Sequence, residues 1–425
     1  MRIGIIGLGY VGLTLAIAAA DCGIDVYGVE INEKIKEALS HKKAHFFEPG
    51  LDTLIEKYSG NRFNCVEKFP TDEKFDAFII TVGTPLLKGS STPNFDYIKS
   101  ALQSIKHCYT GEELIILRST VSVGTTRNIV MPFLAELCGK SEDEIHVAFC
   151  PERTVEGKAI DELKNLPQII SGNNEDALET AENVFRKLTP FVIRMDCIEE
   201  AELVKLYNNT YRDMTFALGN VFCMAAQTFG IDGNKVITAA NKGYSRSNIC
   251  LPGFVGGPCL EKDAYILTNN MKECSSRDFI LSARKFNESL EDMVVDWVKM
   301  KVPAGGTVAL SGMAFKGVPE TSDLRGSNSV NIAQKLVECG FKLRLHDFVA
   351  SVDEMKELNV GEVCADVYSC AEGASALLVL NNNKKYAGVA YNSKLAGISI
   401  LDVWNCCNEL KNSEADICNM GNMFI

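Results

Sequence analysis

The chain opens with Met1-Arg2-Ile3-Gly4-Ile5-Ile6-Gly7-Leu8-Gly9-Tyr10-Val11-Gly12, and this stretch decides the fold. Residues 2–7 predict a short buried strand, and the apolar residues that follow Gly12 predict a helix. Between them, residues 7–12 have the spacing G-x-G-x-x-G. A glycine-rich turn that leaves a strand and opens a helix is typical of the first unit of a doubly wound α/β sheet.

Such a turn is suited to a dinucleotide. The first glycine permits the tight turn, the second lets the backbone approach a pyrophosphate, and the third lets helix and strand pack closely. Glu30 ends the next predicted strand, where a carboxylate would accept a hydrogen bond from a ribose 2′-OH and repel a 2′-phosphate. The pattern predicts NAD as cofactor, and a turn with only a structural role is the alternative. The expected contacts are Gly7, Gly9, Gly12 and Glu30.

Composition narrows the class of protein. The 425 residues are 46% hydrophobic and 23% charged, which predicts a globular chain of two or three domains. The net charge of −12 argues against a nucleic-acid partner. Sixteen cysteines lack a C-x-x-C pair, so we expect no metal site. Glycines interrupt the apolar N-terminal run, and no other segment is long and apolar enough for a membrane span. We therefore expect a cytoplasmic protein without membrane insertion.

Alternating apolar runs and helical stretches indicate two parallel sheets. Residues 199–229 predict a long helix, and residues 262–300 predict more helix after a Gly- and Pro-rich loop. The expected fold class is therefore α/β, with two doubly wound Rossmann-like domains joined by a central helical segment. Ten strands are predicted at residues 2–7, 25–30, 77–82, 114–118, 146–149, 191–193, 307–311, 342–347, 376–380 and 398–403.

A second signal is the loop Gly256-Gly257-Pro258-Cys259-Leu260-Glu261-Lys262-Asp263. A cysteine at the lip of a glycine-rich loop can act as a nucleophile, although it can also be one more buried thiol. Lys205 and Asn209 are four residues apart, so both side chains project from one helical face, which is more often a solvated one. Glu152 and Glu156 follow a predicted strand, and exposed loop carboxylates are the usual interpretation of such residues.

Seven motifs together resemble the nucleotide-sugar 6-dehydrogenases, the UDP-glucose/GDP-mannose dehydrogenase family. They occur in the family's order and span nearly the whole chain. The motifs are GLGYVG (7–12), VGTP (82–85), RSTVSVGTT (118–126), CPERTVEG (150–157), AELVKLYNNTY (201–211), GGPCLEKD (256–263) and GMAFKG…SDLRGS (312–327).

The resemblance implies an enzyme that oxidises the C6 alcohol of a UDP-sugar to a carboxylate, with two NAD consumed per turnover. Cys259 would be the nucleophile that forms a thiohemiacetal and then a thioester. Lys205 and Asn209 would stabilise the oxyanion or aid proton removal. Asp263 would orient a water molecule, and Glu152 would be the acid/base for thioester hydrolysis.

The resemblance also implies domains and ligand contacts. Residues 1–196 would bind NAD, residues 197–302 would form a helical dimerisation domain with the cysteine loop, and residues 303–425 would bind the UDP-sugar. A homodimer is the expected assembly. Further cofactor contacts would be Leu8, Tyr10, Val11, Thr84, Thr120, Glu156 and Arg325. Substrate contacts would be Arg246, Gly256 and Lys316.

The substrate and two other functions stay open. Lys262-Asp263 resembles the UDP-glucose type, whereas Arg246-Ser247-Asn248-Ile249 resembles the N-acetylhexosamine type, and Pro258 matches neither. UDP-glucose and UDP-N-acetylmannosamine are both candidates. A two-electron NAD-dependent hydroxyacid dehydrogenase would need neither Cys259 nor the second sheet. A non-catalytic nucleotide-sugar-binding protein would keep both sheets without making NADH.

Overall fold

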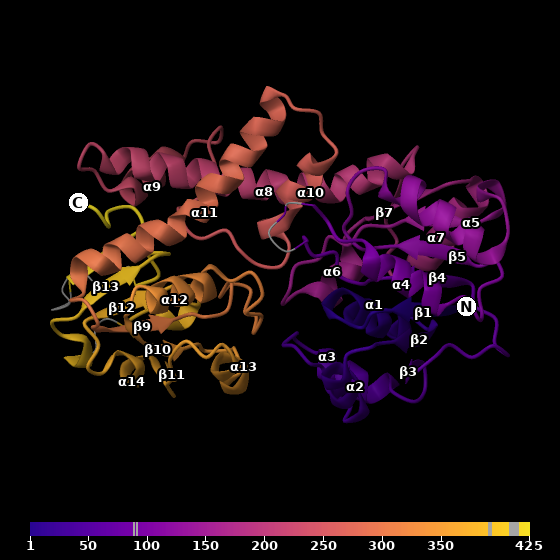
Figure 1. The fold of residues 1–425 in the computed structure, drawn as a ribbon, viewed down its shortest axis with the longest axis horizontal. Coiled ribbons are helices and arrows are strands. Elements are labelled where there is room, and N and C mark those ends of the chain that lie inside the picture. The colour runs from indigo at the N-terminus through magenta and orange to yellow at the C-terminus, as the bar shows by residue number, and fades with distance from the viewer. Residues whose placement is uncertain (88–89, 91, 390–392, 408–415) are drawn as a thin grey trace. The chain divides into compact units, whose positions relative to one another are not determined.

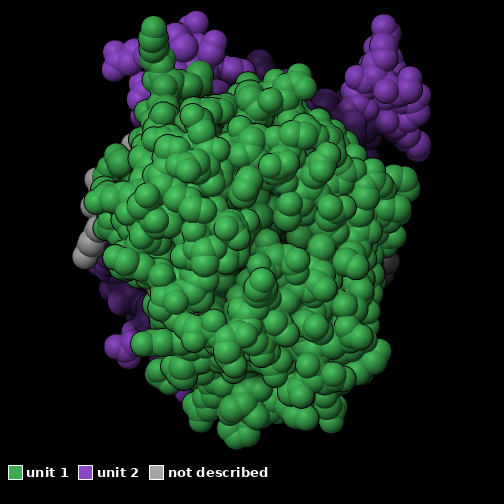
Figure 2. All heavy atoms as spheres, turned by 90° about the vertical axis from the view of Figure 1, so that its right-hand side faces the viewer, with its two compact units in different colours: residues 1–208, 265–272 green, residues 209–264, 273–425 purple. Residues whose placement is uncertain are grey.

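A computed structural model describes residues 1–87, 90, 92–389, 393–407 and 416–425. The chain divides into two compact units, coloured separately in Figure 2. Unit 1 contains residues 1–208 and 265–272, and unit 2 contains residues 209–264 and 273–425. Figure 1 labels helices and strands of both units where there is room.

Unit 1 is built on an eight-stranded sheet with the order β3-β2-β1-β4-β5-β6-β7-β8. All neighbouring strands are parallel except β6 and β7, which are antiparallel. The strands are β1 (Arg2–Ile6), β2 (Asp25–Val29), β3 (Phe63–Val66), β4 (Ala77–Ile80), β5 (Leu114–Leu117), β6 (Val147–Phe149), β7 (Gln168–Gly172) and β8 (Val192–Arg194). The helices assigned wholly to this unit are α1 (Tyr10–Asp21), α2 (Glu33–Ser40), α3 (Leu51–Tyr58), α4 (Asp96–Ser104), α5 (Met131–Cys138), α6 (Ala159–Asn165) and α7 (Glu175–Phe185).

The apolar runs of β4 and β5 explain why helices cover both faces of this sheet. Successive side chains of a strand point to opposite faces. Ala77 and Ile79 accordingly join the core that contains α1, whereas Phe78 and Ile80 join the core that contains α4 and α5. A strand buried on both faces has no polar side to expose, as parallel sheets require.

Unit 2 carries a six-stranded parallel sheet with the order β11-β10-β9-β12-β13-β14. Its strands are β9 (Thr307–Ser311), β10 (Lys342–His346), β11 (Glu362–Val363), β12 (Ala376–Val379), β13 (Ser399–Asp402) and β14 (Asp416–Asn419). Its helices include α9 (Gly233–Asn241), α11 (Ser275–Lys301), α12 (Asn328–Glu338), α13 (Val352–Glu357) and α14 (Val367–Ala371). The apolar faces of α11 and α12 pack together with Val308 and Leu310 of β9 in one core.

Helices α8 (Ile198–Gln227) and α10 (Leu260–Asn269) contribute residues to both units. The long helix predicted at residues 199–229 is confirmed, whereas the helical stretch predicted at residues 262–300 is two helices, α10 and α11. Cys274 precedes α11 in an extended conformation, which ends any continuous helix there. Among the described residues, no helix is long and apolar enough to cross a membrane.

The predicted fold class is confirmed. Both sheets wind outward from a central first strand in the same order, which is the doubly wound Rossmann pattern. The ten predicted strands are present within a residue or two, and the described residues contain four further strands: β3, β7, β11 and β14.

Candidate active site

The glycine-rich turn of unit 1 joins β1 to α1 and leaves space for a ligand. Gly7 has a φ of +90°, a conformation that favours glycine. A Cβ at Gly12 would lie 1.9 Å from the Gly7 carbonyl oxygen, so only glycine lets helix and strand approach this closely. A Cβ at Gly9 would meet nothing within 4 Å. Gly9 caps α1 without a side-chain hydrogen bond, so the open space lies where the helix N-terminus favours an anion. The turn therefore fits a pyrophosphate.

Glu30 follows β2 and reaches back to this turn. Its Oε2 accepts a hydrogen bond from the Leu8 amide at 2.7 Å, and its Oε1 accepts from the amides of Ile31 and Asn32 at 2.8 and 2.9 Å. The carboxylate predicted to contact a ribose thus also holds the glycine-rich turn in place.

Two loops at the carboxyl ends of β4 and β5 are tied together. The buried Thr84 hydroxyl donates to the Thr120 carbonyl at 2.6 Å, and Ser119 Oγ donates to the Val82 carbonyl at 2.6 Å. The structure thus places the predicted cofactor contacts Thr84 and Thr120 side by side. Carboxyl ends of parallel strands are where open α/β sheets bind ligands.

Glu48, which the sequence analysis did not select, connects the turn to the loop after β6. Its carboxylate accepts a hydrogen bond from the Tyr10 hydroxyl and from the amides of Gly157 and Ala159, the last two at 2.7 and 2.8 Å. Burial, followed by the Glu48 hydrogen bond, raises the pKa of Tyr10, and the charge of Glu156 adds to this shift. Glu156 therefore lies within electrostatic reach of the turn.

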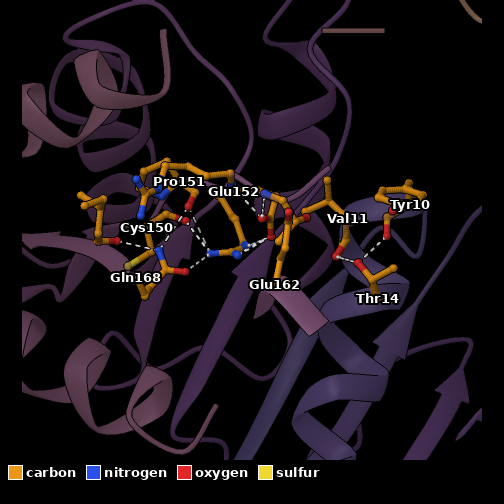
Figure 3. A network of polar contacts seen from close by, with 12 residues as sticks. Tyr10, Val11, Thr14, Cys150, Pro151, Glu152, Glu162 and Gln168 are labelled. Atoms are coloured by element: carbon orange, nitrogen blue, oxygen red, sulfur yellow. Dashed lines mark hydrogen bonds and ion pairs between the residues drawn. The ribbon is translucent and has the colours of Figure 1, made fainter. Parts of the chain in front are cut away.

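Glu152 is buried, so the interpretation as an exposed loop carboxylate is wrong. Its Oε1 accepts from the amides of Arg153 and Thr154 at 2.6 and 2.7 Å, and its Oε2 accepts from Nε of the buried Arg118 at 3.1 Å and also from its Nη2. Figure 3 shows Glu152 beside Pro151 and Gln168 in this network. Burial works to raise the pKa of Glu152, but Arg118 and the Thr154 amide hold it below the ordinary value.

Lys205 of α8 is also buried, which contradicts a solvated helical face. Its charge helps to lower the pKa of Glu152, so the two predicted catalytic groups of unit 1 act on one another. One turn earlier on α8, Glu202 accepts from the amides of Gly124 and Thr126 at 2.6 and 2.9 Å. Glu202 thereby fixes the loop after β5 to the helix that carries Lys205.

In unit 2, Asn209, Lys262 and Asp263 form one hydrogen-bonded set. The Asn209 amide donates to Asp263 Oδ2 at 2.5 Å, and Lys262 Nζ lies 3.2 Å from Asp263 Oδ1. Asn209 and Asp263 are both buried. Burial acts to lower the pKa of Lys262, but the charges of Asp263 and Cys259 outweigh it and raise the pKa above its ordinary value.

Cys259 is exposed, so the alternative of one more buried thiol is wrong. It directly precedes α10, and its carbonyl accepts from the amides of Lys262 and Asp263 at 3.2 and 3.0 Å. A helix N-terminus and a neighbouring ammonium both stabilise a thiolate, so the thiol stands in an environment that favours its nucleophilic form.

The glycines before Cys259 allow its loop to pack closely on a neighbouring segment of unit 2. A Cβ at Gly256 would lie 2.4 Å from Asn328 Oδ1, and one at Gly257 would lie 2.6 Å from the ring of Phe315. The Gly257 amide donates to the Gly326 carbonyl at 2.7 Å. This contact joins the cysteine loop to the motif at residues 312–327, which contains the predicted substrate contact Lys316 and the predicted cofactor contact Arg325.

The remaining predicted residues lie on the surface of unit 2 or near it. Lys316 lies over the ring of Phe315, with 5.2 Å from its Nζ to the ring centroid. Arg325 is exposed and pairs with Asp323, and Arg246 is exposed with its guanidinium over the ring of Tyr244. Roles for these three residues stay predictions.

Comparison with known proteins places these features in a family. The NAD-binding domain of the UDP-glucose/GDP-mannose dehydrogenase family matches residues 1–189, its central domain matches residues 199–289, and its UDP-binding domain matches residues 309–409. A UDP-N-acetyl-D-mannosamine dehydrogenase of Methanocaldococcus jannaschii is 33% identical over 417 residues, which cover 96% of this chain and 93% of that protein.

The chain belongs to the UDP-glucose/GDP-mannose dehydrogenase family. A UDP-N-acetyl-D-mannosamine dehydrogenase of Campylobacter jejuni is 34% identical, with 79% of this chain and 83% of that protein covered. The solved structure of the Pyrococcus horikoshii UDP-N-acetyl-D-mannosamine dehydrogenase superposes with a TM-score of 0.88 at 28% identity over the full length of both chains. The resemblance inferred from the sequence is confirmed, as are NAD as cofactor and a dehydrogenase that acts on a UDP-sugar.

Proposed function

We propose that this family member oxidises the C6 alcohol of UDP-N-acetyl-D-mannosamine to the carboxylate, in two steps that pass through Cys259. The observation that carries the reaction is the exposed Cys259 at the start of α10, beside the set made by Asn209, Lys262 and Asp263. The relatives named above support the sugar. UDP-glucose is the second candidate, because Lys262-Asp263 resembles the UDP-glucose type.

The proposed sequence balances four electrons. Removal of a proton and a hydride from the alcohol gives the aldehyde. Cys259 Sγ then adds to the aldehyde carbon, and the oxygen takes a proton to give a thiohemiacetal. Loss of a second proton and hydride gives a thioester, and water replaces the thiolate to give the carboxylate. NAD supplies the hydride acceptor for each oxidation.

The predicted catalytic residues have distinct proposed roles. Lys205 and Asn209 lie one turn apart on α8, and an ammonium and an amide are suited to stabilise a developing oxyanion. Asp263 would orient the hydrolytic water. Glu152 is held as a carboxylate by Arg118, so it would accept a proton in thioester hydrolysis as a base.

We also propose a homodimer that forms through α8, with the three functional domains at residues 1–196, 197–302 and 303–425. Apolar side chains that a monomer would leave in water support this assembly. On α8 they are Tyr207, Tyr211, Leu218, Val221 and Phe222.

A cytoplasmic location is part of the proposal, because exposed thiols such as Cys259 and Cys274 persist in a reducing compartment.

The test is the number of NADH formed per UDP-sugar consumed with excess NAD. The panel contains UDP-N-acetylmannosamine, UDP-glucose, UDP-N-acetylglucosamine and UDP-galactose. We expect about two NADH with UDP-N-acetylmannosamine, because the cysteine carries the second oxidation. The matched variant is Cys259→Ser, which should lose the second oxidation. One NADH with the wild-type protein would favour the two-electron hydroxyacid dehydrogenase. No NADH with any of the four sugars, despite NAD binding, would favour a different nucleotide sugar or the non-catalytic binding protein.

A further inference from the structure

A buried polar cluster in unit 2, which we call the loop anchor, consists of Asp213 and Asn220 of α8 and Arg284 and Asn287 of α11. None of these side chains is more than 1% exposed. The proposed chemistry uses none of them. Removing a guanidinium and a carboxylate from water costs free energy unless both groups form good hydrogen bonds in the protein. The hydrogen-bond partners of this cluster therefore indicate what it does.

Arg284 contacts the cysteine loop at two places. Its Nη2 donates to the Val255 carbonyl at 3.1 Å, and its Nη1 donates to the Leu260 carbonyl at 3.2 Å. These two carbonyls flank residues 256–259, and Cys259 is the last residue of that segment. One planar guanidinium therefore holds the backbone on both sides of the nucleophile.

The other residues of the loop anchor orient Arg284 and contact the backbone of the cysteine loop at a further residue, Gly253. Arg284 Nη1 donates to Asp213 Oδ1 at 2.7 Å, and Asn287 Nδ2 donates to the same oxygen at 2.9 Å. Asn220 donates to the Gly253 carbonyl at 3.0 Å and accepts from the Gly253 amide at 2.9 Å. Asn220 also donates to Asn287 Oδ1 at 3.0 Å, which links all four residues.

The cysteine loop needs support of this kind. Gly256 and Gly257 have no side chains with which to hold their own backbone, and Gly257 has a φ of +92°. Glycine leaves the chain more conformational freedom than any other residue. Without external contacts, the segment that ends at Cys259 would sample conformations in which the thiol leaves the N-terminus of α10.

We propose that Arg284 is a positioning residue that fixes the cysteine loop, so that the Cys259 thiol stays at the start of α10 and within reach of Lys262. The inference rests on the proposed function, because it assigns Arg284 a part in the chemistry of Cys259. The bidentate geometry of the Arg284 guanidinium is essential. A lysine would keep the positive charge opposite Asp213, but its single ammonium group lacks the planar pair of NH2 groups that bind the two carbonyls.

The experiment follows the alkylation of single cysteines in the full-length protein by iodoacetamide, read by peptide mass spectrometry over a range of pH. Cys274 and Cys339 are exposed in the same unit and serve as internal references. In Arg284→Lys we expect Cys259 alkylation to slow about tenfold relative to both references and its pH profile to move to higher pH, because the thiolate loses its fixed surroundings.

Turnover gives a second readout. The same variant should lower kcat about tenfold or more, with KM for the UDP-sugar and Kd for NAD within about threefold of wild type, because misplacement of a reacting atom acts on the chemical step. Asn220→Ala removes the Gly253 contacts and the bond to Asn287 but leaves both carbonyl contacts of Arg284, so it should shift both readouts in the same direction by less. This second variant also keeps the test decisive if Arg284→Lys does not fold.

Tyr386→Phe is the matched control. It removes a buried hydrogen bond of 2.8 Å to Ser311 in the second sheet, so it destabilises unit 2 without a contact to the cysteine loop. An unchanged Cys259 profile in Arg284→Lys would overturn the inference. So would a slowing that Cys274 and Cys339 share, or one that Tyr386→Phe reproduces. The alkylation readout needs no substrate, so it decides the loop anchor even if the NADH count refutes the proposed function.

Discussion

Substitution of Gly9 by alanine separates cofactor binding from folding in unit 1. Gly9 has φ −63° and ψ −166°, which any residue adopts, and a new Cβ would meet nothing within 4 Å. We therefore expect Gly9→Ala to fold with an unchanged melting temperature. The added methyl would instead occupy the open space at the start of α1, where the backbone must approach the pyrophosphate of NAD.

The magnitude follows from the contacts that the methyl would block. A hydrogen bond between an amide and a charged group contributes about 1.5–3 kcal/mol. Loss of one such bond raises Kd by about tenfold to a hundredfold, since 1.4 kcal/mol is a factor of ten. Calorimetric titration with NAD measures this directly, and thermal unfolding of the same sample reports the stability.

Gly12→Ala is the contrasting variant. Its Cβ would lie 1.9 Å from the Gly7 carbonyl oxygen and 2.6 Å from Thr81 Oγ1, so α1 must shift or the variant must carry strain of about 1–3 kcal/mol or more. This variant should unfold at a lower temperature. A wild-type Kd for NAD in a well-folded Gly9→Ala protein would refute the assignment of the open space to the pyrophosphate. A stable Gly12→Ala protein would refute the packing argument.

Three further predictions concern charged groups. Arg118→Gln leaves Glu152 buried without its ion-pair partner, so the free energy of unfolding measured in urea at pH 7 should be about 3–5 kcal/mol lower than that of the wild type. The pKa of Glu152 is lowered in the folded wild type, so the ionised carboxylate stabilises the folded protein at pH values above the ordinary pKa of a carboxyl group. This stabilisation is lost as the pH falls below the ordinary pKa, so the difference in unfolding free energy between wild type and variant should shrink there. Glu30→Gln removes the charge expected to repel a 2′-phosphate, so the ratio of KM for NADP to KM for NAD should fall, and an unchanged ratio would exclude that role. Lys262→Met removes the ammonium beside Cys259, so iodoacetamide should alkylate this cysteine more slowly at neutral pH; an equal rate would show that the ammonium does not support the thiolate.

The sequence predicted the central strands but missed β3, β11 and β14 at the edges of the sheets and β7 inside the first sheet. β4 and β5 are continuous apolar runs, because both faces of these strands are buried. β11 has two residues and β14 has four, and neither has a fully buried residue pattern that would mark it as a strand. β7 is buried, but Pro167 precedes it and it contains only two large apolar residues.

The candidate site was predicted as separate motifs, and the contacts between them needed the structure. No local pattern distinguishes Lys205 on a solvated face from Lys205 in a buried one, because the packing partners lie elsewhere in the chain. Glu48 and Arg284 gave no local signal at all. Each acts on backbone groups that are distant in sequence, and only the folded chain brings these groups to their side chains.

The strand order also has a consequence for the synthesis of the chain on the ribosome. In each sheet the first strand to be made lies at the centre: Ile3 of β1 pairs with Ala77 of β4, and Val308 of β9 pairs with Ala376 of β12. One edge of each apolar central strand therefore lacks backbone hydrogen-bond partners until a distant segment of the chain has been synthesised. Such edges are templates for association between nascent chains. The rate of synthesis through residues 7–77 and 312–376 thus sets how long each sheet stays vulnerable to aggregation.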